Sequence, residues 1–203
     1  RFHQFIFRWR EPATRNYLLK IFAAFFITGV GGLLLEKKHF KLPETALPIA
    51  LALLVGGILF LTIEYWLKGK PAKNEITWQI AIAVGLAQLV AAVFPGTSRS
   101  GATILIALLF GLNRPLATEF SFLVGIPTML AAGGLKIFKA LIHQPSAAAP
   151  SENWSLVLIG TVVAAIVSFI AVKWLLRFVQ SHTFNTFGWY RIILGAALLI
   201  WFR

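Results

Sequence analysis

Long apolar stretches alternate with short polar segments along almost the whole chain. Seven stretches stand out: residues 17–35, 46–67, 76–94, 101–112, 116–142, 156–176 and 187–202. Most of them reach the roughly 20 residues that a helix needs to cross a bilayer core of about 30 Å. The pattern therefore predicts an all-α polytopic membrane protein, with a single membrane domain over residues 1–203.

The stretch over residues 101–112 is too short to cross a membrane, because a helix of that length spans only about 18 Å. Together with the preceding stretch it predicts a re-entrant helix-loop-helix hairpin over residues 76–112. Pro and Gly break the hairpin at residues 95–100, which leaves backbone groups there without helical partners. Such backbone is tolerated at membrane depth only where protein or a watery cavity surrounds it, so the tip implies a cavity.

Charge placement favours a hairpin that leaves and returns on the same side of the membrane. In that arrangement the basic segments share one face, which the positive-inside tendency assigns to the cytoplasm: residues 1–15, 68–73, 114 and 177–182. The loop at residues 144–155 has no Lys or Arg and falls on the other side. Lys37, Lys38 and Lys41 fit this arrangement poorly. The alternative, in which both arms cross fully, would place the uncharged loop in the cytoplasm.

Composition limits the chemistry that this chain can perform. Hydrophobic residues make up 58% of the chain and charged residues 13%, which excludes a disordered chain and an ordinary soluble domain. The net charge of +12 comes from basic residues scattered between apolar runs. We therefore expect contacts with membrane lipids and no nucleic-acid partner. With no cysteine, four His and only Glu among seven acidic residues, thiolate catalysis is excluded and a zinc enzyme is disfavoured.

One polar motif lies at the tip of the predicted hairpin. It reads Pro-Gly-Thr-Ser-Arg-Ser-Gly-Ala-Thr over residues 95–103. A Ser there can cap the second arm, whose first turn offers free N–H groups and the positive end of a helix dipole. Arg99 adds a planar fork of donors that suits phosphate oxygens. The motif therefore predicts a phosphate site formed by Gly96, Thr97, Ser98, Arg99, Ser100 and Thr103.

A simpler interpretation of the motif is a capped turn whose Arg side chain extends to water. Arg99 lies between two long apolar arms, where burial of a cation is expensive without an anionic partner. This position favours the phosphate site over the simple turn.

Three further polar residues are candidates for supporting the site. Glu119 lies in an apolar stretch, with Ser121 two residues later, and can either balance or orient Arg99 or form a structural ion pair. Gln88, in the first arm of the hairpin, is a candidate hydrogen-bonding partner for the motif, although a contact between helices would explain it equally well.

Two other patterns predict contacts of helices. Glu64 precedes Lys68 by four residues, which suits an ion pair on a helix surface. Glycine pairs at residues 31–32, 56–57 and 133–134 lie in apolar stretches, where small residues let helices approach closely.

Three segments of the chain carry a family resemblance. They read Gly-Leu-Ala-Gln over residues 85–88, the nine-residue motif over 95–103, and Ala-Thr-Glu-Phe-Ser-Phe-Leu-Val-Gly-Ile-Pro over 117–127. These segments closely resemble the undecaprenyl-diphosphate phosphatase family, also called the bacitracin-resistance protein family, and the resemblance covers essentially the whole chain. It implies an inverted-repeat fold in the bacterial inner membrane and hydrolysis of undecaprenyl diphosphate, which recycles the lipid carrier of cell-wall synthesis.

The resemblance also implies roles for individual residues. Four side chains of the motif would bind or act on the diphosphate, with Arg99 and Ser98 as the catalytic candidates: Ser98, Arg99, Ser100 and Thr103. Glu119 and Ser121 would support them. The family has a further glutamate-rich hairpin near its N-terminus that residues 1–203 do not match, so we expect this chain to be part of a longer protein and to carry an incomplete site.

The resemblance also implies a cofactor, whereas an alternative function follows from the broken helices themselves. A divalent cation, Mg²⁺ or Ca²⁺, would take its ligands mainly from that unmatched hairpin, and we assign no metal ligand within this chain. The sequence leaves a homo-oligomer open. The main rival function is a transporter or lipid flippase, because broken helices whose N-termini face a midplane anion site also occur in transporters.

Overall fold

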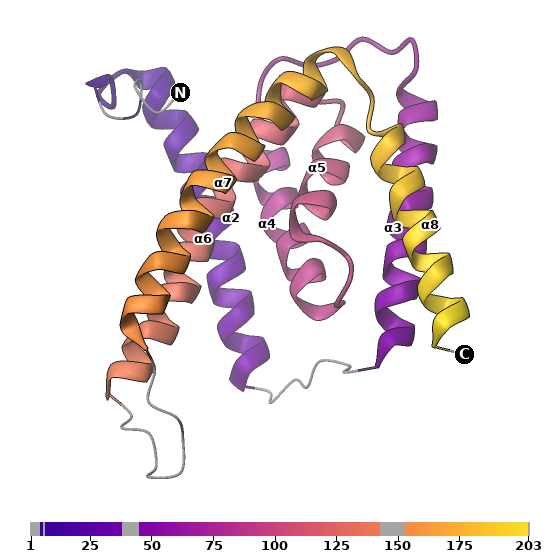
Figure 1. Cartoon of the computed structure of the whole chain (residues 1–203). Helices are drawn as coiled ribbons and strands as arrows, with labels where there is room; N and C mark the ends of the chain where they lie inside the picture. The colour runs from indigo at the N-terminus through magenta and orange to yellow at the C-terminus, as the bar shows by residue number, and fades with distance from the viewer. Residues whose placement is uncertain (1–4, 6, 38–44, 143–152, 203) are drawn as a thin grey trace.

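The computed structural model describes the following residues: 5, 7–37, 45–142 and 153–202 (Figure 1). Within these residues the secondary structure is helical, with no strand, which confirms the predicted all-α class. The helices are α2 (Pro12–Lys37), α3 (Ala46–Leu67), α4 (Trp78–Val93), α5 (Arg99–Leu109), α6 (Arg114–Ile142), α7 (Trp154–Ser181) and α8 (Asn185–Trp201).

Four of these helices, α2, α3, α6 and α7, are long and apolar enough to cross a membrane, judged by length and composition. They confirm the predicted polytopic membrane protein. Two of them extend further than the apolar stretches: α2 starts at Pro12 and α7 ends at Ser181. Both extensions include polar or charged residues, which helix ends outside the hydrocarbon tolerate. Hydropathy alone therefore underestimates the length of these helices.

The short helices α4 and α5 form a hairpin whose two ends lie together. Lys73, which precedes α4, donates its backbone N–H to Gly111 O at 2.7 Å and accepts at its carbonyl from the N–H of Asn113 at 3.0 Å. Gly111 follows α5 with a φ of 85°, a left-handed conformation that suits glycine after a helix end. Figure 1 accordingly shows α4 leaving one end of the bundle and α5 returning to it. The tip of the hairpin lies between the two ends of the long helices.

Three junctions of the chain meet at the end of the bundle where the hairpin starts. The Glu64 carboxylate, near the end of α3, accepts from Arg114 Nε at the start of α6 and from the N–H of Phe184 before α8. We call this the basic end, and define it by the loops at residues 68–77, 110–113 and 182–184.

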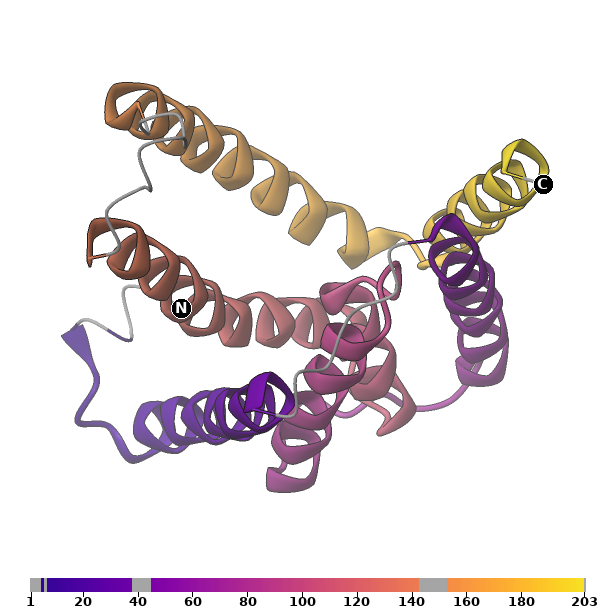
Figure 2. The same cartoon turned by 90° about the horizontal axis from the view of Figure 1, so that it is seen from below.

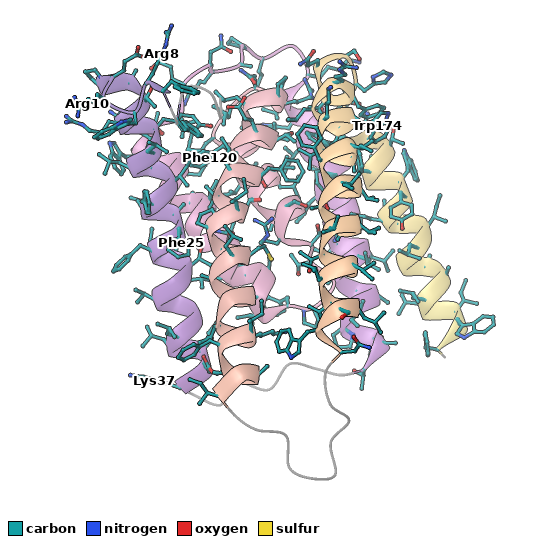
Figure 3. The ribbon with its side chains drawn as sticks, turned by 60° about the vertical axis from the view of Figure 1, so that its left-hand side comes forward. Arg8, Arg10, Phe25, Lys37, Phe120 and Trp174 are labelled. Atoms are coloured by element: carbon teal, nitrogen blue, oxygen red, sulfur yellow. The ribbon has the colours of Figure 1, made fainter. Side chains whose placement is uncertain are left out.

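Basic side chains lie at both ends of the bundle in the part of the chain that the structure describes. Figure 3 shows Arg8 and Arg10 at the end of α2 from which the chain enters, and Lys37 at the opposite end. Lys38, Lys41 and most of the predicted uncharged loop fall in residues 38–44 and 143–152, outside the described residues.

The hairpin occupies the centre of the molecule. Seen from below, α3 and α8 form a pair on one side, α4 and α5 lie in the middle, and α2 and α6 lie on the other side (Figure 2). Apolar residues that are almost fully buried join these layers: Ile80, Val84, Ile104, Leu108 and Phe120. In contrast, every side chain of α7 over residues 154–171 is exposed. The hairpin is therefore held from both sides. In the described part of the chain α7 contacts α6, and its buried residue, Val179, lies near its C-terminal end.

Glycines allow α3 and α8 to pack closely. A Cβ at Gly57 would lie 2.7 Å from the carbonyl oxygen of Gly188, so any side chain there would force the helices apart. This contact confirms the prediction for the pair at residues 56–57. The prediction is wrong for Gly133 and Gly134, which have open space around them in the described part of the chain, because this half of α6 has no closely packed neighbour.

Candidate active site

The backbone at the tip of the hairpin has two residues with positive φ, Gly96 and Ser98. Gly96 has a φ of 88°, and a Cβ there would lie 2.7 Å from the carbonyl oxygen of Ile49 on α3. Ser98 also has a positive φ, 65°, which is uncommon for a residue with a side chain and stores strain. Its Oγ accepts a hydrogen bond from the N–H of Gly101 at 3.3 Å and so caps α5, as the motif predicts.

Arg99, the first residue of α5, extends its guanidinium between α4 and α6. Nη1 donates to Gln88 Oε1 at 3.3 Å. On the other side the guanidinium lies against Gly125, where a Cβ would overlap both Nη atoms. No ion pair involves Arg99 in the part of the chain that the structure describes. A half-buried cation is thus presented at the tip with its charge uncompensated by a neighbouring carboxylate.

Glu119 is placed away from Arg99. Its Oε1 accepts a hydrogen bond from the hydroxyl of Tyr17 on α2 at 3.3 Å. Arg99 contacts α6 at Gly125, which lies about 9 Å further along that helix because each residue rises about 1.5 Å. The geometry therefore separates Glu119 from Arg99, and the Tyr17 contact is a hydrogen bond that joins α6 to α2.

Thr103 and Ser121 join α5 to α6 by a buried hydrogen bond. Their hydroxyl oxygens lie 2.6 Å apart, and both residues are almost fully buried. The Thr103 hydroxyl also lies 2.9 Å from the carbonyl oxygen of Arg99 and 3.0 Å from that of Ser100. In this structure the pair steadies the first turn of α5, and the Thr103 hydroxyl does not face the open tip.

Ser98 and Ser100 are the more accessible hydroxyls of the motif. Ser98 is exposed and Ser100 half-buried, and their Oγ atoms lie 3.5 Å apart. They can approach a ligand that also reaches Arg99. The structure therefore brings Ser98, Arg99 and Ser100 together at the tip, with Gln88 directly behind Arg99.

A second arginine at the tip was not predicted from the sequence. Arg191 on α8 is 7% exposed, and its Nη2 donates to the carbonyl oxygens of Ala52, Gly96 and Thr97 at 3.0 to 3.2 Å. It thereby ties the tip of the hairpin to α3 and α8. Arg191 lies within an apolar stretch, so the argument that singled out Arg99, an arginine among apolar residues, could have found it as well.

The predicted surface pair of Glu64 with Lys68 is wrong. Arg114 Nε donates to Glu64 Oε1 at 2.9 Å and lies 3.1 Å from Oε2. Arg114 Nη2 also donates to Oε2. The Glu64 side chain is only 2% exposed, because it points into the junction of α3, α6 and α8 and away from the helix surface. This is a buried structural ion pair at the basic end.

An apolar groove of about 900 Å³ runs between α3, α4 and α5. Exposed apolar side chains form its walls, among them Val55 on α3, Leu86 on α4 and Leu109 on α5. Thr97 of the motif also lines the groove. A long apolar chain in the groove would therefore place its end group beside the hairpin tip.

Comparison with known proteins decides the family. A family model described as "Bacitracin resistance protein BacA" matches residues 2–197, which is nearly the whole chain and includes every helix described above except the last turn of α8. The chain belongs to the BacA family. As a BacA-family protein with four long apolar helices, it is a multi-pass protein of the inner membrane.

Curated relatives are similar over most of this BacA-family chain. A protein of Rhizobium etli strain CFN 42 named undecaprenyl-diphosphatase is 53% identical over 192 residues, which cover 94% of this chain and 71% of the relative. The protein of the same name from Xanthomonas campestris pv. campestris strain 8004 is 48% identical over 192 residues, 94% of this chain and 72% of the relative. The matched portions include the hairpin motif.

The residues at the tip do not fit a divalent cation by themselves. Mg²⁺ and Ca²⁺ prefer anionic oxygen ligands, whereas the tip offers hydroxyls and two guanidinium groups. The described residues contain no group of three or more His, Cys, Asp or Glu side chains placed to hold a metal. We therefore derive no step of the BacA-family chemistry through a cation bound by this chain.

Proposed function

We propose that this BacA-family protein hydrolyses undecaprenyl diphosphate to undecaprenyl phosphate and inorganic phosphate. This reaction would return the lipid carrier to cell-wall synthesis and confer resistance to bacitracin. Relatives that share about half of its residues carry the name undecaprenyl-diphosphatase. The observation that carries the proposal is the Arg99 guanidinium at the tip of a hairpin between membrane-spanning helices, where no described residue forms an ion pair with it.

The tip suits the charge of a diphosphate. The Arg99 fork can hold two phosphoryl oxygens at once, and the free N–H groups at the start of α5 add the positive end of a helix dipole. As the bond between the terminal phosphorus and the bridging oxygen breaks, negative charge builds on the phosphoryl group and on the departing lipid phosphate. Donors that are already oriented stabilise this charge without reorganisation, which lowers the barrier.

Ser98 remains our candidate nucleophile. Attack by its Oγ on the terminal phosphorus would release undecaprenyl phosphate with the bridging oxygen, and water would then cleave the phosphoserine to give inorganic phosphate. Within the described residues, the Ser98 hydroxyl contacts the N–H of Gly101 and the hydroxyl of Ser100, neither of which is a base. The base that takes its proton is left unassigned.

The groove between α3, α4 and α5 suits the isoprenoid chain of the substrate. Its walls are almost entirely apolar, and Thr97 of the motif is one of its lining residues. An isoprenoid that lies in the groove would be shielded from water along its length, while its diphosphate reaches Arg99. The apolar groove thus suits the isoprenoid chain of the substrate, and the hairpin tip suits its diphosphate.

Substitution of Arg99 tests the proposed function. In the full-length protein purified in detergent, Arg99→Ala should lower kcat for undecaprenyl diphosphate roughly 10²- to 10³-fold, the scale for loss of one oriented donor at a transition state. Arg177→Ala is the matched control, because Arg177 is exposed near the basic end and should leave kcat unchanged. Phosphate release measures activity, and thermal unfolding checks that both variants fold. Near-normal turnover of Arg99→Ala would contradict the proposal.

The same protein in vesicles separates hydrolysis from transport. The N-terminus of α5 lies within the bundle, as the half-helices of transporters do, so a flippase is the second candidate. Release of phosphate without movement of lipid between leaflets supports the phosphatase. Movement of lipid without release of phosphate supports the flippase.

A further inference from the structure

The side-chain amide of Gln88 accepts a hydrogen bond from Arg99, so its orientation affects where the guanidinium points. Arg99 Nη1 donates to Oε1 of Gln88, whose side chain lies in the interior with 2% of the residue exposed. A glutamine amide has an acceptor at one end and donors at the other. If the amide turned over, its NH₂ group would face the guanidinium N–H groups and repel them. The orientation of Gln88 therefore decides whether Arg99 is held.

Thr28 on α2 holds the other end of that amide. Gln88 Nε2 donates to Thr28 Oγ1 at 2.8 Å. Thr28 Oγ1 lies 2.9 Å from the carbonyl oxygen of Ala24 and 3.2 Å from that of Gly85, and both of these groups can only accept. The single hydroxyl proton of Thr28 thus goes to the backbone, and its lone pairs face Gln88. Thr28 acts as an acceptor, so the amide presents NH₂ to Thr28 and oxygen to Arg99.

Close packing of α2 against α4 brings Thr28 and Gln88 together. A Cβ at Gly85 would lie 2.9 Å from the carbonyl oxygen of Ala24, so the two backbones approach as closely as glycine permits. Ala24 is fully buried in this contact. Thr28 stands one helical turn after Ala24 on the same face of α2, which brings its hydroxyl to Gln88.

We infer that Thr28 is a positioning residue for the phosphatase reaction, which acts on Arg99 through the amide of Gln88. The inference rests on the proposed function. Thr28 contacts neither substrate nor reacting atoms; it fixes the direction of the hydrogen bonds from α2 through α4 to α5. Loss of its acceptor releases the amide, and the guanidinium then samples orientations that do not match the departing phosphate.

Substitution by valine removes the acceptor and keeps the branched shape. In the full-length protein, Thr28→Val should lower kcat for undecaprenyl diphosphate about tenfold, the effect expected when one hydrogen bond to a charged group loses its alignment. KM should change less than kcat, and Thr28→Ser, which restores the acceptor, should return kcat to within about twofold of wild type. Thr62→Val is the matched control and should leave kcat unchanged. The Thr62 hydroxyl also donates to a carbonyl of its own helix, that of Ile58 at 2.8 Å, but it lies on an exposed face of α3.

A double-mutant cycle separates positioning from general support of the fold. If Thr28 acts only through Gln88, Thr28→Val should have no further effect on kcat in a Gln88→Ala background. Equal and additive losses in both backgrounds, or a loss of thermal stability with unchanged kcat, would overturn the inference and leave Thr28 as a packing residue.

A binding measurement distinguishes failure of this inference from failure of the proposed function. The probe is orthovanadate added together with a prenyl phosphate, which mimics the phosphoryl group in transit, and its affinity for Thr28→Val should fall about as much as kcat does. If the wild-type protein hydrolyses undecaprenyl diphosphate and Thr28→Val matches it in kcat and affinity, the positioning role is refuted and the phosphatase stands. If the wild-type protein releases no phosphate, the proposed function fails. Unchanged affinity of Thr28→Val for the probe would then refute the positioning role separately.

Discussion

The guanidinium of Arg99 is confined between a hydrogen-bond acceptor on α4 and a glycine on α6. Gln88 determines where one Nη atom points, and Gly125 provides the space in which the plane of the guanidinium lies. A side chain of any size at Gly125 would take that space. At the scale of single residues, the orientation of this one cation depends on positions from three other helices, α2, α4 and α6.

We predict that Gly125→Ala inactivates the protein without unfolding it. The new methyl group would overlap both Nη atoms of Arg99 and push the guanidinium from its place, so kcat should fall at least about tenfold, as a displacement of a catalytic group by an ångström or so does. Helix propensity favours alanine over glycine by roughly 1 kcal/mol, so thermal stability should be preserved. Steady-state kinetics and thermal unfolding in detergent measure the two effects.

Gly133→Ala is the control for this substitution. It lies on the same helix, and no heavy atom lies within 4 Å of the Cβ position in the described residues. It should therefore retain full activity. If Gly125→Ala retained the kcat of Gly133→Ala, the space at Gly125 would have no part in holding Arg99.

The ion pairs Glu64–Arg114 and Arg8–Glu11 differ in burial and in the number of helices that they connect. Glu64 and Arg114 join α3 to α6 where the hairpin ends, and Glu64 also accepts from the N–H that precedes α8. Arg8 and Glu11, in contrast, form an exposed pair with a separation of 3.7 Å. The first contact fixes three helices relative to one another, and the second lies on a solvated surface.

We predict that Arg114→Ala destabilises the protein by about 3 to 5 kcal/mol, because it leaves the buried Glu64 carboxylate without its partner. The double variant Glu64→Gln with Arg114→Ala should be more stable than Arg114→Ala alone, since the charge is then removed and the amide oxygen can still accept from Phe184. Reversible unfolding in mixed detergent measures these differences. Arg8→Ala should change the free energy of unfolding by less than about 1 kcal/mol.

The sequence predicts most helices, but it predicts few of the contacts between them. Apolar length identified the helices and the short hairpin, because hydropathy is a local property of the chain. Arg99 was found because an arginine between apolar arms is conspicuous. Thr28 and Arg114 could not be assigned partners, since their contacts with Gln88 and Glu64 join residues far apart in the sequence. Arg191 carried the same local signal as Arg99 and was overlooked.

At the scale of the whole molecule, the hairpin is enclosed by helices on two sides and opens along a third. The α3–α8 pair lies on one side of it and the α2–α6 layer on the other (Figure 2). Arg191 binds the backbone of the tip and of α3. The groove between α3, α4 and α5 remains open along its length, with exposed apolar walls. Thr97 is the residue of the motif that lines this groove.

We predict that a bulky side chain in the groove weakens binding of the lipid and leaves the chemistry intact. Val55→Trp, which projects into the groove, should raise KM for undecaprenyl diphosphate about tenfold with little change in kcat, because it removes contacts that are equal in the ground and transition states. Val163→Trp on the exposed face of α7 is the control, and should match wild type. An unchanged KM for Val55→Trp would show that the isoprenoid lies elsewhere.

The open apolar groove also determines how the protein meets its substrate. A lipid that slides into the groove from the side never leaves the hydrocarbon phase, so the quantity that sets the encounter rate is its mole fraction in the bilayer or micelle. Added detergent would therefore slow turnover by surface dilution even when the bulk concentration of lipid is held constant. Rates measured in different detergent amounts should collapse onto one curve only when plotted against that mole fraction.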